Sequence, residues 1–291
     1  MTSLTSARRR KTTLMAAVLV LPALIVIAGL MAVPLAQLVQ ASFHRAEFGQ
    51  ILPGRTFENY QTVLFSPLYW EIYAKTLGAA ALVTLLCTIL GYPVAWHLVN
   101  ARKSVQPLLF FLIAAPLLVN TVVRTYGWLL LLGRKGVINT VLMQLGLIDN
   151  PLTLTSNYIG LVVGSTQVFL PFMILSIATS LQGIDRRLLE SADILGASGP
   201  YRFFTVDLPL AAPGLIAGAI LVFSLMLGAF VTPLMLGGSA IQYLSVSVYT
   251  DALVLFNLPR ATALSMILLA ITAAIYAFQA RLSPRLKETQ R

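Results

Sequence analysis

The chain has 291 residues, of which 58% are hydrophobic and only 10% are charged, and its mean hydropathy is +0.84. Soluble domains carry about 25% charged residues, so this composition excludes an ordinary soluble fold and makes lipid the solvent for much of the chain. The net charge of +10 does not indicate nucleic acid, because the basic residues stand in short clusters between apolar runs, where they orient a membrane protein.

Six apolar segments follow one another along the chain, each near the ~20 residues needed to cross a bilayer. Lipid offers the backbone no hydrogen-bond partner, so each segment is expected to form a helix. The segments are Leu14 to Val39, Tyr73 to Leu98, Pro107 to Leu132, Ile159 to Leu181, Leu210 to Leu236 and Ala261 to Ala280. We therefore predict an all-α integral membrane protein with one six-helix membrane domain over residues 14–281, between tails at 1–13 and 282–291.

The distribution of Lys and Arg predicts the orientation of this domain. If the N-terminus is cytoplasmic, the cytoplasmic side carries thirteen of the twenty basic residues, and the outer side with its rim carries six. The thirteen are Arg8, Arg9, Arg10, Lys11, Arg102, Lys103, Arg186, Arg187, Arg202, Arg281, Arg285, Lys287 and Arg291. Cytoplasmic loops are enriched in Lys and Arg, and an even number of spans returns the chain to its starting side. We therefore expect both termini in the cytoplasm.

The outer connections contain candidate contact residues. An aromatic set in the first outer loop and at its edge could dock a solute-binding protein. Its members are Phe57, Tyr60, Tyr69 and Trp70. Asp251, in the last outer loop, is expected to be solvated or to meet a binding protein or a substrate.

The third apolar segment contains Arg124, the only formally charged residue deep within a predicted span. Arginine is costly at that depth, so it should face protein or water and have a partner. Asn120 lies one turn earlier, and Tyr126 and Trp128 follow toward the outer side. One interpretation is that these four residues form a gate or line a transport pathway. The other is a structural arginine, hydrogen-bonded to backbone carbonyls at a kink near Pro116.

The inner loop at residues 182–209 has features of a folded segment. Asp185 suits the N-cap of a helix, and apolar residues then recur at i, i+4 and i+7 from Leu188. Gly196 can end this helix in a left-handed conformation. The Gly-Pro pair at 199–200 suits the start of a second short helix. The sequence predicts helix, glycine turn and helix outside the bilayer.

This loop has two possible roles. A loop that only connects two spans could be a few residues long, so one with amphipathic structure usually binds a partner. Its second piece adds an aromatic surface from Tyr201, Phe203 and Phe204. The alternative is a surface helix that only covers the end of the bundle.

The loop resembles the EAA loop of ABC importer permeases, whose pattern is Glu-Ala-Ala, three residues, Gly, nine residues and Ile-x-Leu-Pro. At that spacing this chain has Glu190-Ser191-Ala192, Gly196 and Val206-Asp207-Leu208-Pro209, with Ser for Ala and Val for Ile. The resemblance implies a type I ABC importer permease of MetI-like architecture in the bacterial inner membrane, with the loop as a coupling helix on a cytoplasmic ATPase. The contact residues that it implies are Glu190, Ser191, Ala192, Asp193, Gly196, Leu208 and Pro209.

Other segments resemble the spermidine/putrescine permeases of the PotB type, namely residues 115–128, 148–151, 170–173 and 235–238. This resemblance implies a polyamine importer in which the chain pairs with a related permease, two ATPase subunits and an external solute-binding protein. The chain has no Gly-x-x-x-x-Gly-Lys-Ser phosphate loop. We therefore expect no catalytic site, cofactor or metal in this chain, and ATP hydrolysis in the partner subunit.

The residues alone leave three alternative functions to consider. An ion-coupled secondary transporter needs ionisable groups within its spans, and only Arg124 qualifies. A membrane enzyme needs clustered His, Asp, Glu, Ser or Cys at the membrane face, and the spans lack such a cluster. An importer of the same family with a different small solute is the third alternative.

Overall fold

A computed structural model describes residues 21–22, 25–47, 49–185, 187–188, 191, 194–196, 198–238 and 241–288. Five helices within these ranges are long and apolar enough to cross a membrane. They are Ile25–Ser42, Pro67–Asn100, Tyr158–Gln182, Gly199–Leu227 and Leu258–Ala277. A sixth span is present if a bent pair of helices counts as one. The prediction of an all-α membrane protein is confirmed.

The predicted third span is not one straight helix. It consists of α4 (Gln106–Leu118) and α5 (Thr121–Leu132), and the helical pieces on the two sides of the break are bent by 95°. Pro116 has no N–H to continue the helical ladder, and α4 ends two residues after it. The Asn120 side chain then accepts the backbone N–H of Val122 at 2.8 Å and caps the new helix.

The other elements complete the chain between the apolar helices. The outer ones are β1 (Arg45–Glu47), β2 (Gln50–Leu52), α2 (Glu58–Phe65), α6 (Val137–Gln144), α11 (Leu244–Tyr249) and the π-helical segments η2 (Pro233–Gly237) and η3 (Thr250–Val254). The long helices are α3 (Pro67–Asn100), α7 (Tyr158–Gln182), α10 (Leu208–Leu227) and α12 (Leu258–Glu288), and α10 is preceded by α9 (Gly199–Arg202) and the π-helical η1 (Phe203–Asp207). Strands β1 and β2 pair antiparallel, with Arg45 opposite Leu52.

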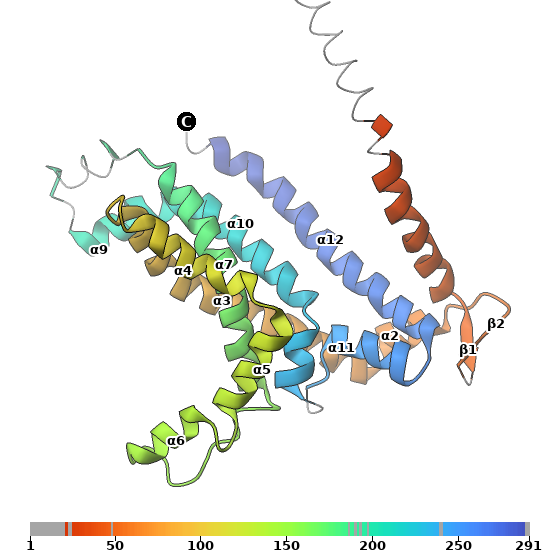
Figure 1. Ribbon diagram of the computed structural model, residues 1–291. Helices are drawn as coiled ribbons and strands as arrows, with labels where there is room; N and C mark the ends of the chain where they lie inside the picture. Colours follow the sequence, from red (N-terminus) through yellow and green to blue (C-terminus); the bar gives the residue numbers. More distant parts are fainter. Residues whose placement is uncertain are drawn as a thin grey trace, which may run out of the picture.

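The core is built from α3, α7 and α10, which pack on one another. Within the chain, 67% of the α7 span is buried, against 6% of the first helix, Ile25–Ser42. Two glycines bring α10 close to α7 (Figure 1). A Cβ atom at Gly214 would lie 2.4 Å from the Cβ of Ser180, and one at Gly218 would lie 2.8 Å from the sulfur of Met173. Small residues at these sites therefore allow the helices to approach.

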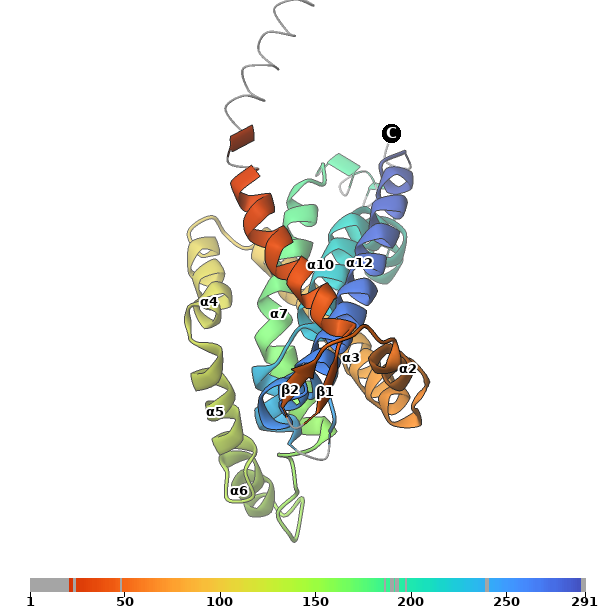
Figure 2. The same cartoon turned by 90° about the vertical axis from the view of Figure 1, so that its right-hand side faces the viewer.

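The two ends of the bundle differ in what they carry. The start of the first helix, the end of α12 and α9 lie on the same side, the upper one in Figures 1 and 2. The hairpin of β1 and β2, with α2 and α6, lies on the opposite side. The part of the predicted inner loop that contains α9 therefore lies on the same side as the start of the first helix and the end of α12.

Candidate functional site

The inner loop begins and turns as its sequence predicts. The Asp185 carboxylate accepts the backbone N–H of Arg187 at 3.0 Å, which is the expected cap. Gly196 has a φ of +78°, the left-handed conformation that favours glycine at a helix end. The hydroxyl of Ser191 donates to the backbone oxygen of Arg187 at 2.7 Å. Of the predicted contact residues, Glu190, Ala192 and Asp193 lie outside the described residues.

Apolar side chains on this loop are open to solvent. Ile194 and Leu195 are 85% and 87% exposed, and Leu188 is also exposed. Tyr201 and Phe204 are exposed on the next short segment. Leu188, Ile194 and Leu195 lie outside the five membrane-length helices of the described chain, and exposed apolar side chains in such a position are typical of a binding surface.

The third aromatic residue of the loop has a different environment. Phe203 was predicted to share the exposed surface, but its ring is half-buried and contacts Tyr92 of α3 edge-on, with centroids 5.2 Å apart. Near it, the 5% exposed side chain of Asp207 lies 3.5 Å from the guanidinium of Arg202. Leu208 and Pro209 follow directly as the first turn of α10. Sequence reasoning missed Tyr92 and Asp207, although an acidic residue between Val206 and Leu208 was a visible signal.

Arg124 lies just after the break in the third span and is half-buried. One guanidinium nitrogen, Nη1, donates to the backbone oxygen of Pro116 at 2.9 Å. The Nε atom is buried and has no hydrogen-bond partner, and no described residue forms an ion pair with Arg124. The bond to Pro116 is the contact that the structural interpretation describes.

The residues predicted around Arg124 have different surroundings. Asn120 is the N-cap of α5, and its backbone oxygen accepts the N–H of Arg124, one turn later, at 3.1 Å. Tyr126 is exposed. The indole Nε1 of Trp128 donates to the side-chain oxygen of Gln167 at 3.1 Å, so this residue joins α5 to α7.

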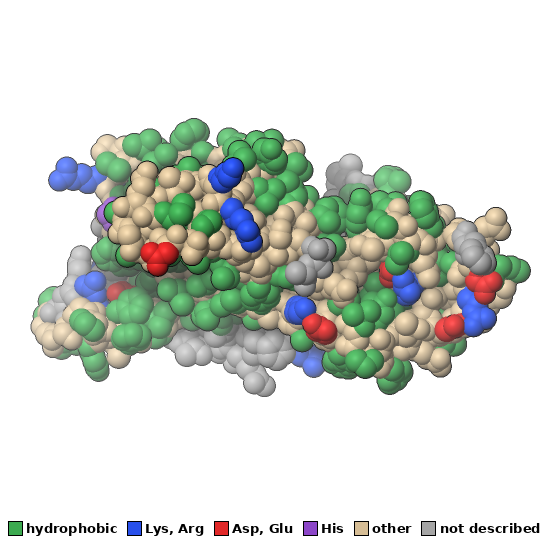
Figure 3. Space-filling view, turned by 90° about the horizontal axis from the view of Figure 1, so that it is seen from below, with side chains coloured by type: hydrophobic (Ala, Val, Ile, Leu, Met, Phe, Trp, Pro, Cys, Tyr) green, Lys and Arg blue, Asp and Glu red, His purple; other side chains and the backbone are tan. Residues whose placement is uncertain are grey.

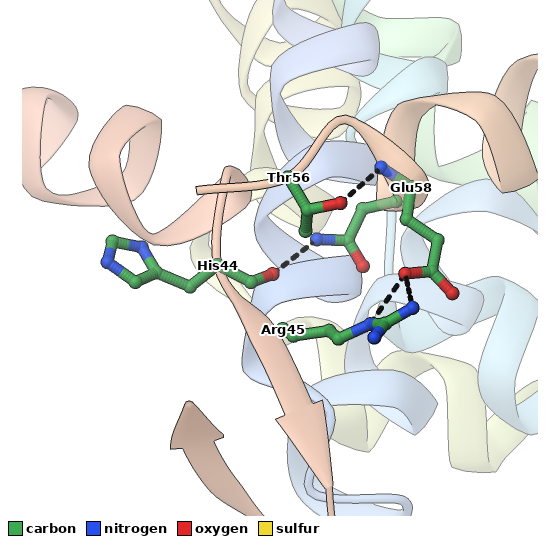
Figure 4. Close-up of polar contacts among 5 residues, drawn as sticks. His44, Arg45, Thr56 and Glu58 are labelled. Carbon is green, nitrogen blue, oxygen red and sulfur yellow. Dashed lines mark hydrogen bonds and ion pairs between the residues drawn. The ribbon is translucent and has the colours of Figure 1, made fainter. Parts of the chain in front are cut away.

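On the outer side, side-chain contacts fix α2 beside the hairpin. The amide of Asn59 donates to the backbone oxygens of Ser42 at 2.9 Å and of His44 at 2.7 Å, and Arg45 forms an ion pair with Glu58 (Figure 4). These contacts therefore hold the end of the first helix and strand β1 against α2.

The predicted outer aromatic set is only partly exposed. Phe57 and Trp70 are exposed, whereas Tyr69 is buried and Tyr60 is hydrogen-bonded to Ser42 at 2.8 Å. Figure 3 shows this side of the molecule, where charged side chains lie in small separate groups among hydrophobic and other atoms.

Asp251 is not solvated, which corrects the expectation for the last outer loop. It accepts two hydrogen bonds from Arg260, at 2.9 Å from Nε and 2.6 Å from Nη2. The pair lies beside an outer cavity of about 380 Å³, which polar side chains of Gln242, Ser247 and Thr250 also line. The ion pair joins η3 to the start of α12.

Comparisons with known proteins agree with this architecture. Residues 87–288 match the family described as binding-protein-dependent transport system inner membrane component. The spermidine/putrescine transport system permease protein PotB of Haemophilus influenzae is 36% identical over 224 residues, which cover 76% of this chain and 78% of that protein. PotB of Escherichia coli is 39% identical over 184 residues, which cover 63% of this chain and 66% of that protein.

The fold also matches a solved structure. A bacterial alginate ABC transporter, in complex with alginate pentasaccharide-bound periplasmic protein, contains a chain that superposes with a TM-score of 0.77 at 18% identity. The match covers 96% of this chain and 97% of that one. Because the family match covers more than half of the sequence, the chain belongs to the binding-protein-dependent transport system inner membrane components, the permease subunits of ABC importers.

Proposed function

We propose that this permease carries a polyamine of the spermidine or putrescine class into the bacterial cell, with both termini in the cytoplasm. The observation that carries the solute assignment is the 36% and 39% identity to two PotB proteins. ATP is hydrolysed by separate cytoplasmic subunits, and an external binding protein delivers the solute. An importer of another small solute is the main alternative.

The inner loop is the coupling helix in this proposal. Its contact residues are Glu190, Ser191, Ala192, Asp193, Gly196, Leu208 and Pro209. Docking would remove the exposed Ile194 and Leu195 from water, which is favourable by about 25 cal/mol per Å² of apolar surface. The left-handed Gly196 shapes the turn that an ATPase cleft would receive.

A second, related permease would cover the side of the bundle formed by α4 and α5. Within this chain α4 has no buried residue, and Leu118 at its end is exposed. The unpartnered Nε of Arg124 could there meet an acceptor from the second permease. Asn120, Arg124, Tyr126 and Trp128 would lie along the pathway or its gate. Arg124 would repel a cationic solute on direct contact, and this charge repulsion favours a role in the gate over a role as a solute ligand.

Uptake into proteoliposomes tests the solute and the energy source together. The complex should take up labelled spermidine or putrescine only with ATP inside and binding protein outside, and collapse of the proton or sodium gradient should not reduce uptake. Uptake that follows an ion gradient without ATP would indicate a secondary transporter. Uptake of an unrelated solute under these conditions, with no uptake of polyamine, would reassign the substrate.

A pair of glycine variants tests the coupling loop. Gly196 and Gly199 both have open space around the missing Cβ, but only Gly196 has a positive φ. Gly196→Val should therefore strain the turn, by roughly 1–2 kcal/mol, and reduce co-purification of the ATPase. Gly199→Val is the matched control and should retain the ATPase. Equal retention by both variants would contradict the proposed role of the turn.

A further inference from the structure

Where the end of the inner loop meets the core, four side chains lie at positions that the family motif leaves unspecified. We call Tyr92, Arg202, Phe203 and Asp207 the junction. Phe203 reaches from the loop into the bundle, where its ring meets the ring of Tyr92 at 90°. Tyr92 is 8% exposed and is part of the main hydrophobic core. A displacement of the loop at Phe203 therefore acts directly on α3.

The backbone through the junction is helical from α9 to α10. Arg202 and Leu208, on either side of η1, have helical dihedral angles, and the N–H of Leu208 bonds to the oxygen of Phe203. The chain thus continues from α9 into α10 through one π-helical turn. Such turns occur mostly as short segments inside α-helices and often at functional sites.

Asp207, the last residue of η1, forms an ion pair across this turn. Its carboxylate is almost fully buried and lies 3.5 Å from Arg202, which is five residues earlier in the chain. A buried charge is stable only when paired, so the ion pair holds the two ends of η1 together. The hydroxyl of Tyr92 is also buried, and it has no hydrogen-bond partner.

Beyond the junction, α10 is packed tightly on α7. The glycines at 214 and 218 let the two helices approach so closely that an added Cβ atom would clash at either position. The first turn of α10 starts directly at the end of η1. Motion that enters at the junction would thus move α3, α7 and α10 together.

We propose that the junction is a rigid joint that converts movement of the coupling loop into movement of the bundle, with Phe203 and Tyr92 as the contact and the Arg202–Asp207 ion pair as the stiffener. These are positioning residues for transport, because none of them touches solute or nucleotide in this proposal. The inference rests on the proposed function of the loop as the ATPase contact.

The test measures solute uptake and ATP hydrolysis in the same proteoliposomes, containing the whole complex. Phe203→Ala should leave the ATPase bound and hydrolysing ATP but lower the solute carried per ATP by about fivefold or more, the lower range for coupling between sites. Tyr276→Ala removes an exposed aromatic ring from α12, outside the loop and the junction, and should keep the wild-type ratio per assembled complex.

Variants at Tyr92 and Asp207 separate the joint from a general packing defect. Tyr92→Phe keeps the ring and should keep the ratio, whereas Tyr92→Ala should lower it as Phe203→Ala does. Asp207→Asn should lower the ratio, and Asp207→Glu should restore part of it. Leu90→Ala, on the exposed side of α3, is the control for truncation of this helix.

The outcomes distinguish this inference from the proposed function. If the wild-type complex contains no ATPase, the coupling function itself fails, whatever the variants do. If wild-type transport needs ATP and Phe203→Ala retains the full ratio, the joint is wrong and the coupling function stands. Phe203→Leu serves the same purpose if the alanine variant does not accumulate, because it keeps apolar volume but loses the edge-to-face contact.

Discussion

At the scale of single residues, the buried pair of Asp251 and Arg260 should contribute strongly to stability. The carboxylate is 7% exposed and receives both hydrogen bonds from one guanidinium. Arg260→Ala would leave a buried charge without compensation, so we expect a loss of about 3–5 kcal/mol in the free energy of unfolding. Thermal unfolding of the detergent-purified protein measures the change.

The exposed pair of Lys75 and Glu71 provides the control. Its side chains are 36% and 61% exposed, although its atoms are only 2.7 Å apart. Lys75→Ala should cost less than about 1 kcal/mol, because solvent screens exposed ion pairs. Similar midpoints for the two variants would mean that Asp251 is solvated after all. Asp251→Asn, added to Arg260→Ala, should recover part of the lost stability.

Arg124 is the second residue whose role a substitution can decide. Removing its bond to the Pro116 oxygen by Arg124→Ala should loosen the break between α4 and α5 and lower uptake severalfold at normal expression. Arg124→Lys keeps a charge and a donor and should retain more uptake. Unchanged uptake by the alanine variant would count against any gate at this position.

At the scale of elements, the contact between α7 and α10 makes a sharp prediction. Gly214→Ala would place a methyl group 2.4 Å from Ser180 and should destabilise the protein by about 1–3 kcal/mol through overpacking. Gly127, on α5, has nothing within 4 Å of a built Cβ. Gly127→Ala should be neutral or stabilising by up to about 1 kcal/mol. Unfolding midpoints that fall in the reverse order would contradict this packing.

The elements also show what local sequence can and cannot predict. The cap at Asp185 and the turn at Gly196 depend on residues beside them in the chain, and both were predicted. The direction of the chain after Pro116 depends on tertiary packing, and hydropathy carries no information about a bend of 95°. The burial of Asp251 depends on Arg260, whose pairing a one-dimensional pattern could not reveal.

At the scale of the whole molecule, the proposed function of the coupling loop determines how the bundle is oriented in the membrane. The coupling loop, the start of the first helix and the end of α12 share one side of the bundle, and the loop after α6 lies on the other (Figure 1). If the loop meets a cytoplasmic ATPase, the described chain ends must face the cytoplasm as well. The bias of Lys and Arg toward that side independently favours the same orientation.

Single cysteines can test this orientation, because the chain has only Cys87 and its side chain is fully buried. Asn150→Cys and Ser198→Cys place thiols at exposed positions on opposite sides of the bundle. A membrane-impermeant maleimide should label Asn150→Cys in intact spheroplasts, and Ser198→Cys only after the membrane is opened. The unsubstituted protein should stay unlabelled in both cases. Labelling of Ser198→Cys in intact spheroplasts would place the coupling loop outside the cell, where no cytoplasmic ATPase could reach it.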